Sequence, residues 1–372
     1  MNRPAPLTSR KSLFNSVQQT PRQTPKKPPR IVVAGAGAIG CFCGGLWAAA
    51  GFPVTLLGRA RVLAPIVQNG LRLTDFSGMD KVLPRGSFSC SEDPSVLAGA
   101  DLVVVAVKSS ATAEMANLIA HHASPAALIL SFQNGLGNAA LLQDMLPGRD
   151  VRAAMVPFNV VSRQEPELDS EGVVKGGPVI AGFHRASSGG IVMASGPGYW
   201  GRRLTLPHMV ISESEDIAGV QWGKLLINLN NALNALSGLT LVEQLQDRRW
   251  RRLMADQMAE ALQVMRAAGL RPVSTTPLPA WTTPYILRLP NWAFTRVAAQ
   301  MLTIDPLARS SMAQDLMLRR ATEVDALQGE IQRLGHATGT ATPITDLVIR
   351  AIRVTEKKQA GLPMMEPSLL VR

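Results

Sequence analysis

Residues 31–59 read IVVAGAGAIGCFCGGLWAAAGFPVTLLGR, and four elements of secondary structure follow one another in them. The short apolar run Ile31–Ala34 is typical of a buried parallel strand. The apolar segment after Gly40 predicts a helix, Gly51 ends it, and Pro53–Leu57 predicts a second strand. A strand, a glycine turn, a helix and a strand within about 30 residues are the setting that a dinucleotide-binding fingerprint requires.

Three glycines in this turn have the spacing G-x-G-x-x-G. We expect Gly35 to permit the tight turn, Gly37 to let bare backbone approach a pyrophosphate, and Gly40 to let the helix lie close to the strand. The N-terminus of the helix then offers unpaired N–H groups to phosphates. The alternative is a glycine turn that merely packs well. The predicted cofactor contacts in the turn are Gly35, Ala36, Gly37, Ala38, Ile39 and Gly40.

The second strand ends at Gly58 and Arg59, where this fold meets the adenosine ribose. An acidic residue at this end would hold the 2′-hydroxyl of NAD, whereas an arginine accommodates the 2′-phosphate of NADP. Arg59, with Arg61 close by, therefore predicts NADPH as the cofactor. The alternative is an ordinary surface arginine.

The formal net charge of +11 is concentrated at the N-terminus. Residues 1–30 contain seven basic and no acidic residues, which leaves +4 for the other 342. We expect residues 1–30 to be a disordered basic tail and the protein to be cytoplasmic, with a mitochondrial transit peptide as the alternative. The nearly neutral body does not favour nucleic-acid binding.

Composition argues against a membrane-spanning segment, a disulfide-stabilised fold and a metal site. The uncharged run from Ile31 to Gly58 is long enough to resemble a membrane span, but its glycines and Pro53 oppose one. Three cysteines and five scattered histidines show neither a disulfide framework nor a metal-ligand spacing, so we expect no metal.

Two more predicted strands place polar residues at one edge of the sheet. Asp101–Lys108 ends in a lysine, and Ala126–Phe132 is followed by Asn134. Ligands bind beyond the carboxyl ends of strands in open parallel sheets, so Lys108 and Asn134 predict a crevice there.

The character of the chain changes after about residue 212. We expect residues 31–212 to form a Rossmann-type, doubly wound α/β domain and residues 213–350 an all-helical domain. The last residues, 351–372, predict a loose tail. The predicted helices include Ile217–Leu236, Leu241–Ala268 and Ser310–Leu334.

Lys224 and Asn228 lie four residues apart, so they share one helix face. The helix continues through an asparagine-rich run that ends at Asn234. Buried amides need partners, so this run either faces a polar pocket, which we favour, or braces a network.

The start of the last long helix has two interpretations. Ser311 fits a helix N-cap, with Gln314 completing a capping box. Alternatively, its hydroxyl and the free N–H groups bind a carboxylate. Further along, Glu323 is spaced to lie near the face of Leu316 and Leu327, so its carboxylate is expected to be partly buried.

Several blocks together resemble the ketopantoate reductases, which are two-domain NADPH-dependent enzymes. The resemblance covers about residues 31–343. It depends on VAGAGAIG, VVAVK at Lys108 and QNG at Asn134. The blocks GKLLINLNNALNALSG, from 223, and SSMAQDLMLRRATEVDALQG, from 310, are far more specific than the glycine motif.

The resemblance implies reduction of 2-dehydropantoate to (R)-pantoate in pantothenate biosynthesis. It implies roles for Lys224 as the catalytic acid and for Glu323 in holding the reacting hydroxyl or the lysine. The implied substrate-binding residues are Asn228, Asn231, Ser311 and Asn134, and the implied cofactor contacts are the glycine turn, Arg59, Lys108 and Asn134. A 2-oxo acid substrate and a possible homodimer follow, with no nucleic acid or membrane partner.

One position departs from the family pattern. Ala232 stands where the family usually has a second substrate-binding asparagine, so either Asn231 substitutes for it or the pocket is altered. Two alternatives therefore stay open: a reductase of another branched 2-oxo acid, and a non-catalytic NADP-binding sensor. For catalysis, we expect Lys224 to have a pKa near the ordinary value of about 10.4 and to be charged at neutral pH.

Overall fold

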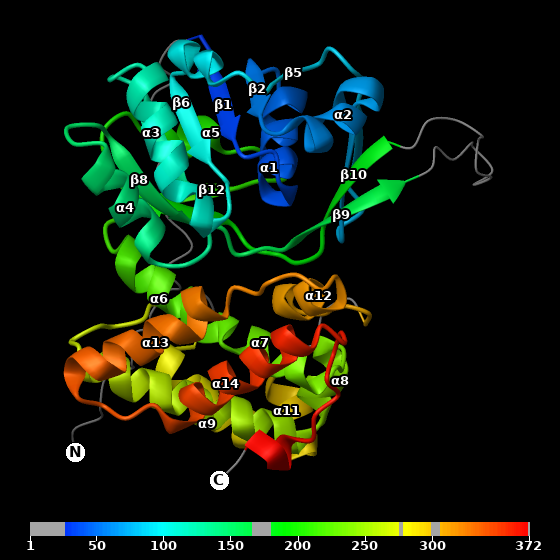
Figure 1. The fold of residues 1–372 in the computed structure, drawn as a ribbon, viewed down its shortest axis with the longest axis vertical. Coiled ribbons are helices and arrows are strands. Elements are labelled where there is room, and N and C mark those ends of the chain that lie inside the picture. The colour runs from blue at the N-terminus through cyan, green and yellow to red at the C-terminus, as the bar shows by residue number, and fades with distance from the viewer. Residues whose placement is uncertain (1–26, 166–179, 275–277, 299–305, 371–372) are drawn as a thin grey trace, which may run out of the picture.

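The computed structural model describes residues 27–165, 180–274, 278–298 and 306–370. In Figure 1 an α/β half lies above a helical half, and α6 lies at the junction between them. The predicted doubly wound α/β fold followed by helices is confirmed. Of the expected tail, residues 1–26 lie outside the described residues. Within the described ranges no helix is both long and apolar enough to cross a membrane.

An eight-stranded sheet forms the centre of the α/β half, in the order β12-β11-β8-β7-β6-β1-β2-β5. Every neighbouring pair is parallel except β11 and β8, which are antiparallel. The strands are β1 (Ile31–Ala34), β2 (Val54–Leu57), β5 (Ser89–Ser91), β6 (Leu102–Val105), β7 (Leu128–Ser131), β8 (Val151–Met155), β11 (Ile191–Ala194) and β12 (Ile211–Ser214).

Helices cover both faces of this sheet, which explains why β1 is apolar throughout. Ile31 and Val33 pack in a core with helix α1, whereas Val32 and Ala34 pack in a second core with α3 and α4. A strand with two buried faces has no polar position. These helices are α1 (Ala38–Ala49), α3 (Thr112–His122) and α4 (Gly137–Met145), and the smaller α5 (Trp200–Leu204) precedes β12.

Residues 151–211 complete the main sheet only in part. β8 and β11 do so, but β9 (Val160–Glu165) and β10 (Ile180–Arg185) pair with β3 (Leu71–Asp75) and β4 (Asp80–Leu83) in a second sheet. This sheet covers the outer face of α1, where a Cβ on Gly45 would lie 2.8 Å from Leu71 Cδ1. The helix α2 (Ala60–Asn69) leads into β3. The apolar face of α1 therefore requires the second sheet.

The helical half has its own core, and each long helix predicted there is divided in two. The first break is at Leu229, the second is at Asp247, whose carboxylate caps the following helix, and the third is residues 318–323. The helices are α6 (Ile217–Asn228), α7 (Asn230–Ser237), α8 (Leu241–Gln246), α9 (Arg248–Ala267), α10 (Thr283–Arg288), α11 (Asn291–Val297), α12 (Ser311–Met317), α13 (Val324–Thr338) and α14 (Pro343–Lys358).

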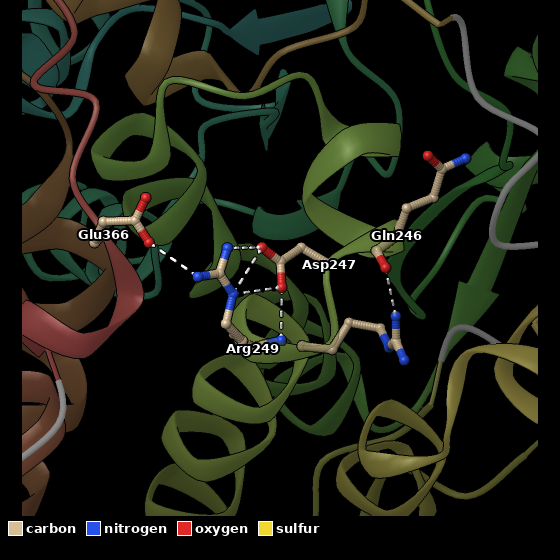
Figure 2. Close-up of polar contacts among 5 residues, drawn as sticks. Gln246, Asp247, Arg249 and Glu366 are labelled. Carbon is tan, nitrogen blue, oxygen red and sulfur yellow. Dashed lines mark hydrogen bonds and ion pairs between the residues drawn. The ribbon is translucent and has the colours of Figure 1, made fainter.

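The prediction of a loose tail from residue 351 is wrong as far as residue 370. Helix α14 continues to Lys358, and the next residues dock on the helical half. The backbone N–H of Met365 donates to the Leu236 carbonyl, and Leu370 is only 1% exposed. Figure 2 shows Arg249, at the start of α9, between Asp247 and Glu366, and its Nη1 lies 3.1 Å from Glu366 Oε2. Burial of Leu370 contributes more to the stability of this segment than the exposed ion pair between Arg249 and Glu366 does.

Candidate functional site

The turn between β1 and α1 has the geometry that its glycines were expected to provide. Gly35 has φ +118°, and a Cβ on it would lie 2.6 Å from the carbonyl carbon of Ala106. A Cβ on Gly40 would lie 2.2 Å from the Gly35 oxygen, so α1 packs directly on the turn. A Cβ on Gly37 would lie 3.9 Å from the Ala106 oxygen, an ordinary van der Waals contact, so this position is not crowded.

The start of α1 is also free to meet a ligand. No described side chain caps this helix at Gly37, so the first N–H groups of the helix keep their hydrogen-bonding capacity. An uncapped helix N-terminus is a place where a pyrophosphate group can bind. Arg59 lies at the end of β2, and its side chain is exposed and makes no ion pair with a described residue.

A lysine of the helical half touches the α/β half. Lys224, on α6, donates from Nζ to Asn134 Oδ1 at 2.9 Å and to the carbonyl oxygen of Val156. The Asn134 side chain also lowers the pKa of the carboxyl of Glu323, the residue before α13. Asn134 therefore acts on both Lys224 and Glu323, two residues 99 positions apart, from the opposite side of the junction.

The glycine turn lies close to this junction. Gly35 packs against the backbone N of Val107, 2.7 Å from a Cβ built on Gly35. The Val107 carbonyl accepts a hydrogen bond from Gln133 Nε2 at 3.1 Å, and Gln133 directly precedes Asn134. These contacts link the glycine turn through Gln133 to Asn134, the residue that binds Lys224.

A narrow crevice surrounds the Lys224 ammonium. Asn228, one turn after Lys224 on α6, lies on the same wall. Lys108, at the carboxyl end of β6, is exposed and lowers the pKa of the Glu323 carboxyl, so it lies within electrostatic reach of the crevice. The described lining residues are Gln133, Asn134, Gly135, Leu136, Ala154, Met155, Val156, Gln221, Lys224, Leu225, Asn228 and Leu327.

The ionisation of the two central groups differs from that of free side chains. Burial lowers the pKa of Lys224 to about 8, although the Glu323 carboxylate opposes this change. The expectation of an ordinary lysine pKa is therefore wrong, because desolvation disfavours the ammonium form. Burial and the nearby Asp315 carboxylate raise the pKa of Glu323. The two shifts bring the pKa values of Lys224 and Glu323 closer together, as is common for pairs of groups at catalytic sites.

The cap of α12 differs from the expected one. Ser310, not Ser311, is the N-cap, and its hydroxyl accepts from the backbone N–H of Ala313. The Ser310 hydroxyl also donates to the carbonyl of Asn231. This arrangement leaves the Ser311 hydroxyl in contact with Asn231 Nδ2, 3.5 Å away. Ser311 is therefore available to a ligand, because its neighbour performs the structural role.

The asparagine run has two functions rather than the single one expected. Asn230 and Asn234 are buried and bind Gln244, so they brace α7 against α8. Of the four asparagines only Asn228 lines the crevice within the described residues. Ala232 is completely buried among apolar side chains, so it cannot present a group to substrate.

The sequence did not point to three residues that lie near the site. Val156 contributes only a backbone carbonyl, which no sequence pattern reveals. Asp315 lies four residues after Ser311 on α12, so the two share a helix face. This spacing could have indicated that Asp315 lies near the site. Gln328 is completely buried on α13 and donates from Nε2 to the Leu229 carbonyl at 2.8 Å. Leu229 is the break between the helices that carry Asn228 and Asn231.

Comparison with known families agrees with this geometry. The model of the family described as ketopantoate reductase PanE/ApbA matches residues 31–177, and the model of its C-terminal part matches residues 216–356. The chain belongs to the ketopantoate reductase family. It is therefore an oxidoreductase acting on CH–OH and keto groups.

Individual relatives of this ketopantoate reductase family member cover nearly nine tenths of its sequence. The 2-dehydropantoate 2-reductase of Halobacterium salinarum is 28% identical over 88% of this chain and 99% of its own. The solved ketopantoate reductase of Ralstonia eutropha is 29% identical, with a TM-score of 0.69 over 89% and 99% of the two chains. A D-mandelate dehydrogenase solved with NADH and anilino(oxo)acetate has a TM-score of 0.64 over 89% and 99%, and at 20% identity it shows a shared fold alone.

Proposed function

We propose that this protein reduces 2-dehydropantoate to (R)-pantoate, with NADPH as the hydride donor and Lys224 as the proton donor. The contact between Lys224 Nζ and Asn134 Oδ1, at 2.9 Å, gives this proposal its main support. It holds an ammonium group at the carboxyl edge of the sheet, beside the predicted cofactor turn. The names of the curated relatives support the choice of substrate.

The chemistry assigns each residue a separate task. NADPH, when bound, supplies a hydride to the keto carbon, and negative charge develops on the oxygen. Lys224 donates a proton to that oxygen, a contribution of about 10²–10⁴-fold. With a pKa of about 8, the ammonium is mostly present at pH 7 and loses its proton more readily than an ordinary lysine. Asn228, Asn231 and Ser311 bind the substrate, and Glu323 orients the lysine or the hydroxyl.

A second candidate is a reductase of another branched 2-oxo acid. Ala232 has no exposed surface and stands where the family usually has a substrate-binding asparagine. Asn231, whose Nδ2 lies 3.5 Å from Ser311 Oγ, supports the view that a neighbouring amide performs this task. The choice between the two substrates depends on whether Asn231 reaches the substrate group that the family's asparagine at position 232 usually binds.

A spectrophotometric assay tests these proposals. NADPH oxidation is followed with a panel of branched 2-oxo acids that includes 2-dehydropantoate, and NADPH binding is measured separately by calorimetry. We expect 2-dehydropantoate to have the highest kcat/KM. A higher value for another 2-oxo acid would favour the second candidate. Binding of NADPH without oxidation by any substrate would instead indicate the sensor.

We also propose that the protein is a homodimer. The solved ketopantoate reductase of Staphylococcus aureus, 17% identical with a TM-score of 0.62, is described as dimeric. Sedimentation velocity would distinguish a dimer from the 39.8 kDa monomer.

A further inference from the structure

An acidic side chain lies beside Arg59, at the place where NADP-binding folds meet the adenosine ribose. Glu92 directly follows β5, the strand that pairs with β2. The Gly58 N–H donates to the Ser91 carbonyl at 3.1 Å, so the chain ends of β2 and β5 run side by side. The Glu92 Oε2 accepts a hydrogen bond from the backbone N–H of Ala60 at 2.9 Å.

This hydrogen bond fixes the charge of Glu92 in place. Ala60 is the first residue of α2, and a helix N-terminus attracts anions because its N–H groups are unpaired. Glu92 and Arg59 form no ion pair with each other, although they are neighbours in space. The carboxylate thus occupies the N–H group that an incoming phosphate would otherwise use.

The two side chains favour opposite cofactors. An arginine at the end of the second strand accommodates a 2′-phosphate, whereas an acidic group at this position accepts a hydrogen bond from a 2′-hydroxyl. Like charges brought together at a surface repel each other, so a carboxylate beside the 2′-phosphate weakens its binding.

We propose that Glu92 sets the cofactor preference: its carboxylate opposes the 2′-phosphate of NADPH and accepts a hydrogen bond from the 2′-hydroxyl of NADH. Arg59 and Glu92 then act against each other, so the preference for NADPH over NADH is smaller than Arg59 alone would give. This inference depends on the proposed nicotinamide-dependent reductase, but it concerns binding and does not require turnover.

The adjacent acidic residue provides a matched control. Asp93 is also exposed, but its carboxylate accepts from the backbone N–H of Ser95 at 2.9 Å and from the Ser95 hydroxyl at 2.5 Å. It is therefore turned to its own loop, and Asp93→Asn removes the same charge without changing the contact at Ala60. The substitution Glu92→Gln keeps an oxygen that can accept from Ala60 N–H, so α2 retains its cap.

The test measures dissociation constants of NADPH, NADH, adenosine 2′,5′-bisphosphate and ADP by calorimetry. We expect Glu92→Gln to lower the dissociation constants of NADPH and the bisphosphate about tenfold and to raise that of NADH about threefold. Asp93→Asn should change each dissociation constant by less than about twofold. A thermal melt of each variant checks that the fold is kept.

Each result decides one point. An unchanged ratio of NADPH to NADH affinity in Glu92→Gln would overturn the inference, as would an equal shift in Asp93→Asn. Absence of binding by both dinucleotides to the wild-type protein would overturn the inference and the proposed function together. Binding with the expected shift but without turnover would support the inference while rejecting the reductase.

Discussion

Lys224 Nζ lies 2.9 Å from Asn134 Oδ1, and this contact joins the two halves of the protein at the crevice. The two residues are 90 positions apart and belong to α6 and to the loop after β7. Because Asn134 also lowers the pKa of the Glu323 carboxyl, one amide from the sheet side acts on both ionisable groups from the helical side.

Replacing the lysine should remove the proton donor without removing the cofactor. We expect Lys224→Ala to lower kcat at least about 100-fold, which corresponds to about 2.7 kcal/mol of barrier. The dissociation constant of NADPH should stay within about twofold, since the lysine contacts the turn only indirectly. Lys81→Ala, on the exposed strand β4, is the control and should keep full activity. Unchanged turnover in Lys224→Ala would exclude the lysine as the acid.

Asn134 should matter as the residue that orients the acid. We expect Asn134→Ala to lower kcat about 10- to 100-fold, because the ammonium loses the amide oxygen that holds it in the crevice. Asn117→Ala, on the surface of α3, removes an exposed asparagine for comparison. Steady-state kinetics of both variants give the result, and equal activities would contradict the orienting role.

The pH dependence should report the lowered pKa of the lysine. The proton donor must be charged, so kcat/KM for reduction should fall as pH rises through about 8. An ordinary lysine would keep the rate constant up to about pH 10. The pH–rate profile of the wild-type enzyme is the measurement, and a descending limb near 10 would show that burial does not act on Lys224.

The lowered pKa of Lys224 should also make the free energy of unfolding depend on pH. The unfolded lysine holds its proton up to about pH 10.4, whereas the folded one releases it near 8. Between these values the unfolded state binds more protons, so the free energy of unfolding rises with pH. Below pH 8 both states are protonated and the full penalty of burying the charge remains. Thermal melts at pH 7.5 and 9.5 should show this rise in the wild type and not in Lys224→Ala.

Gln328 should act as a positioning residue. Its hydrogen bond to the Leu229 carbonyl holds the break between α6 and α7. We expect Gln328→Met to raise KM several-fold and to reduce the free energy of unfolding by about 1–3 kcal/mol, because a buried carbonyl loses its partner. Gln328→Glu, which retains the shape of the side chain but has an ionisable group, should not rescue KM at pH 8. Gln332→Met, four residues later on the same helix, removes a hydrogen bond to Asp346 instead and is the control for KM, which it should leave unchanged.

Arg59 should contribute mainly to the affinity for NADPH. We expect Arg59→Ala to weaken NADPH at least about tenfold and to leave NADH nearly unchanged, because a charge-assisted hydrogen bond to the 2′-phosphate is worth about 1.5–3 kcal/mol. Calorimetric titration with both dinucleotides measures this. Equal losses for the two cofactors would exclude a 2′-phosphate contact at Arg59.

Local patterns were enough for the elements close to the glycine turn. The run Ile31–Ala34, the glycine turn and the strand that ends at Leu57 lie where the sequence predicts them, because backbone sterics and hydrophobic periodicity act within a few residues. The family blocks around Lys224 and Glu323 were equally visible, since they consist of consecutive residues.

Relations between distant residues needed the tertiary structure. The sequence names Asn134, Lys224 and Glu323, but only packing of the helical half on the sheet edge brings them together and lowers the pKa of the lysine. It also cannot show that Ser310 rather than Ser311 caps α12, or that Glu92 lies beside Arg59. Desolvation and hydrogen bonding depend on which surfaces meet, and surfaces meet only after the chain has folded.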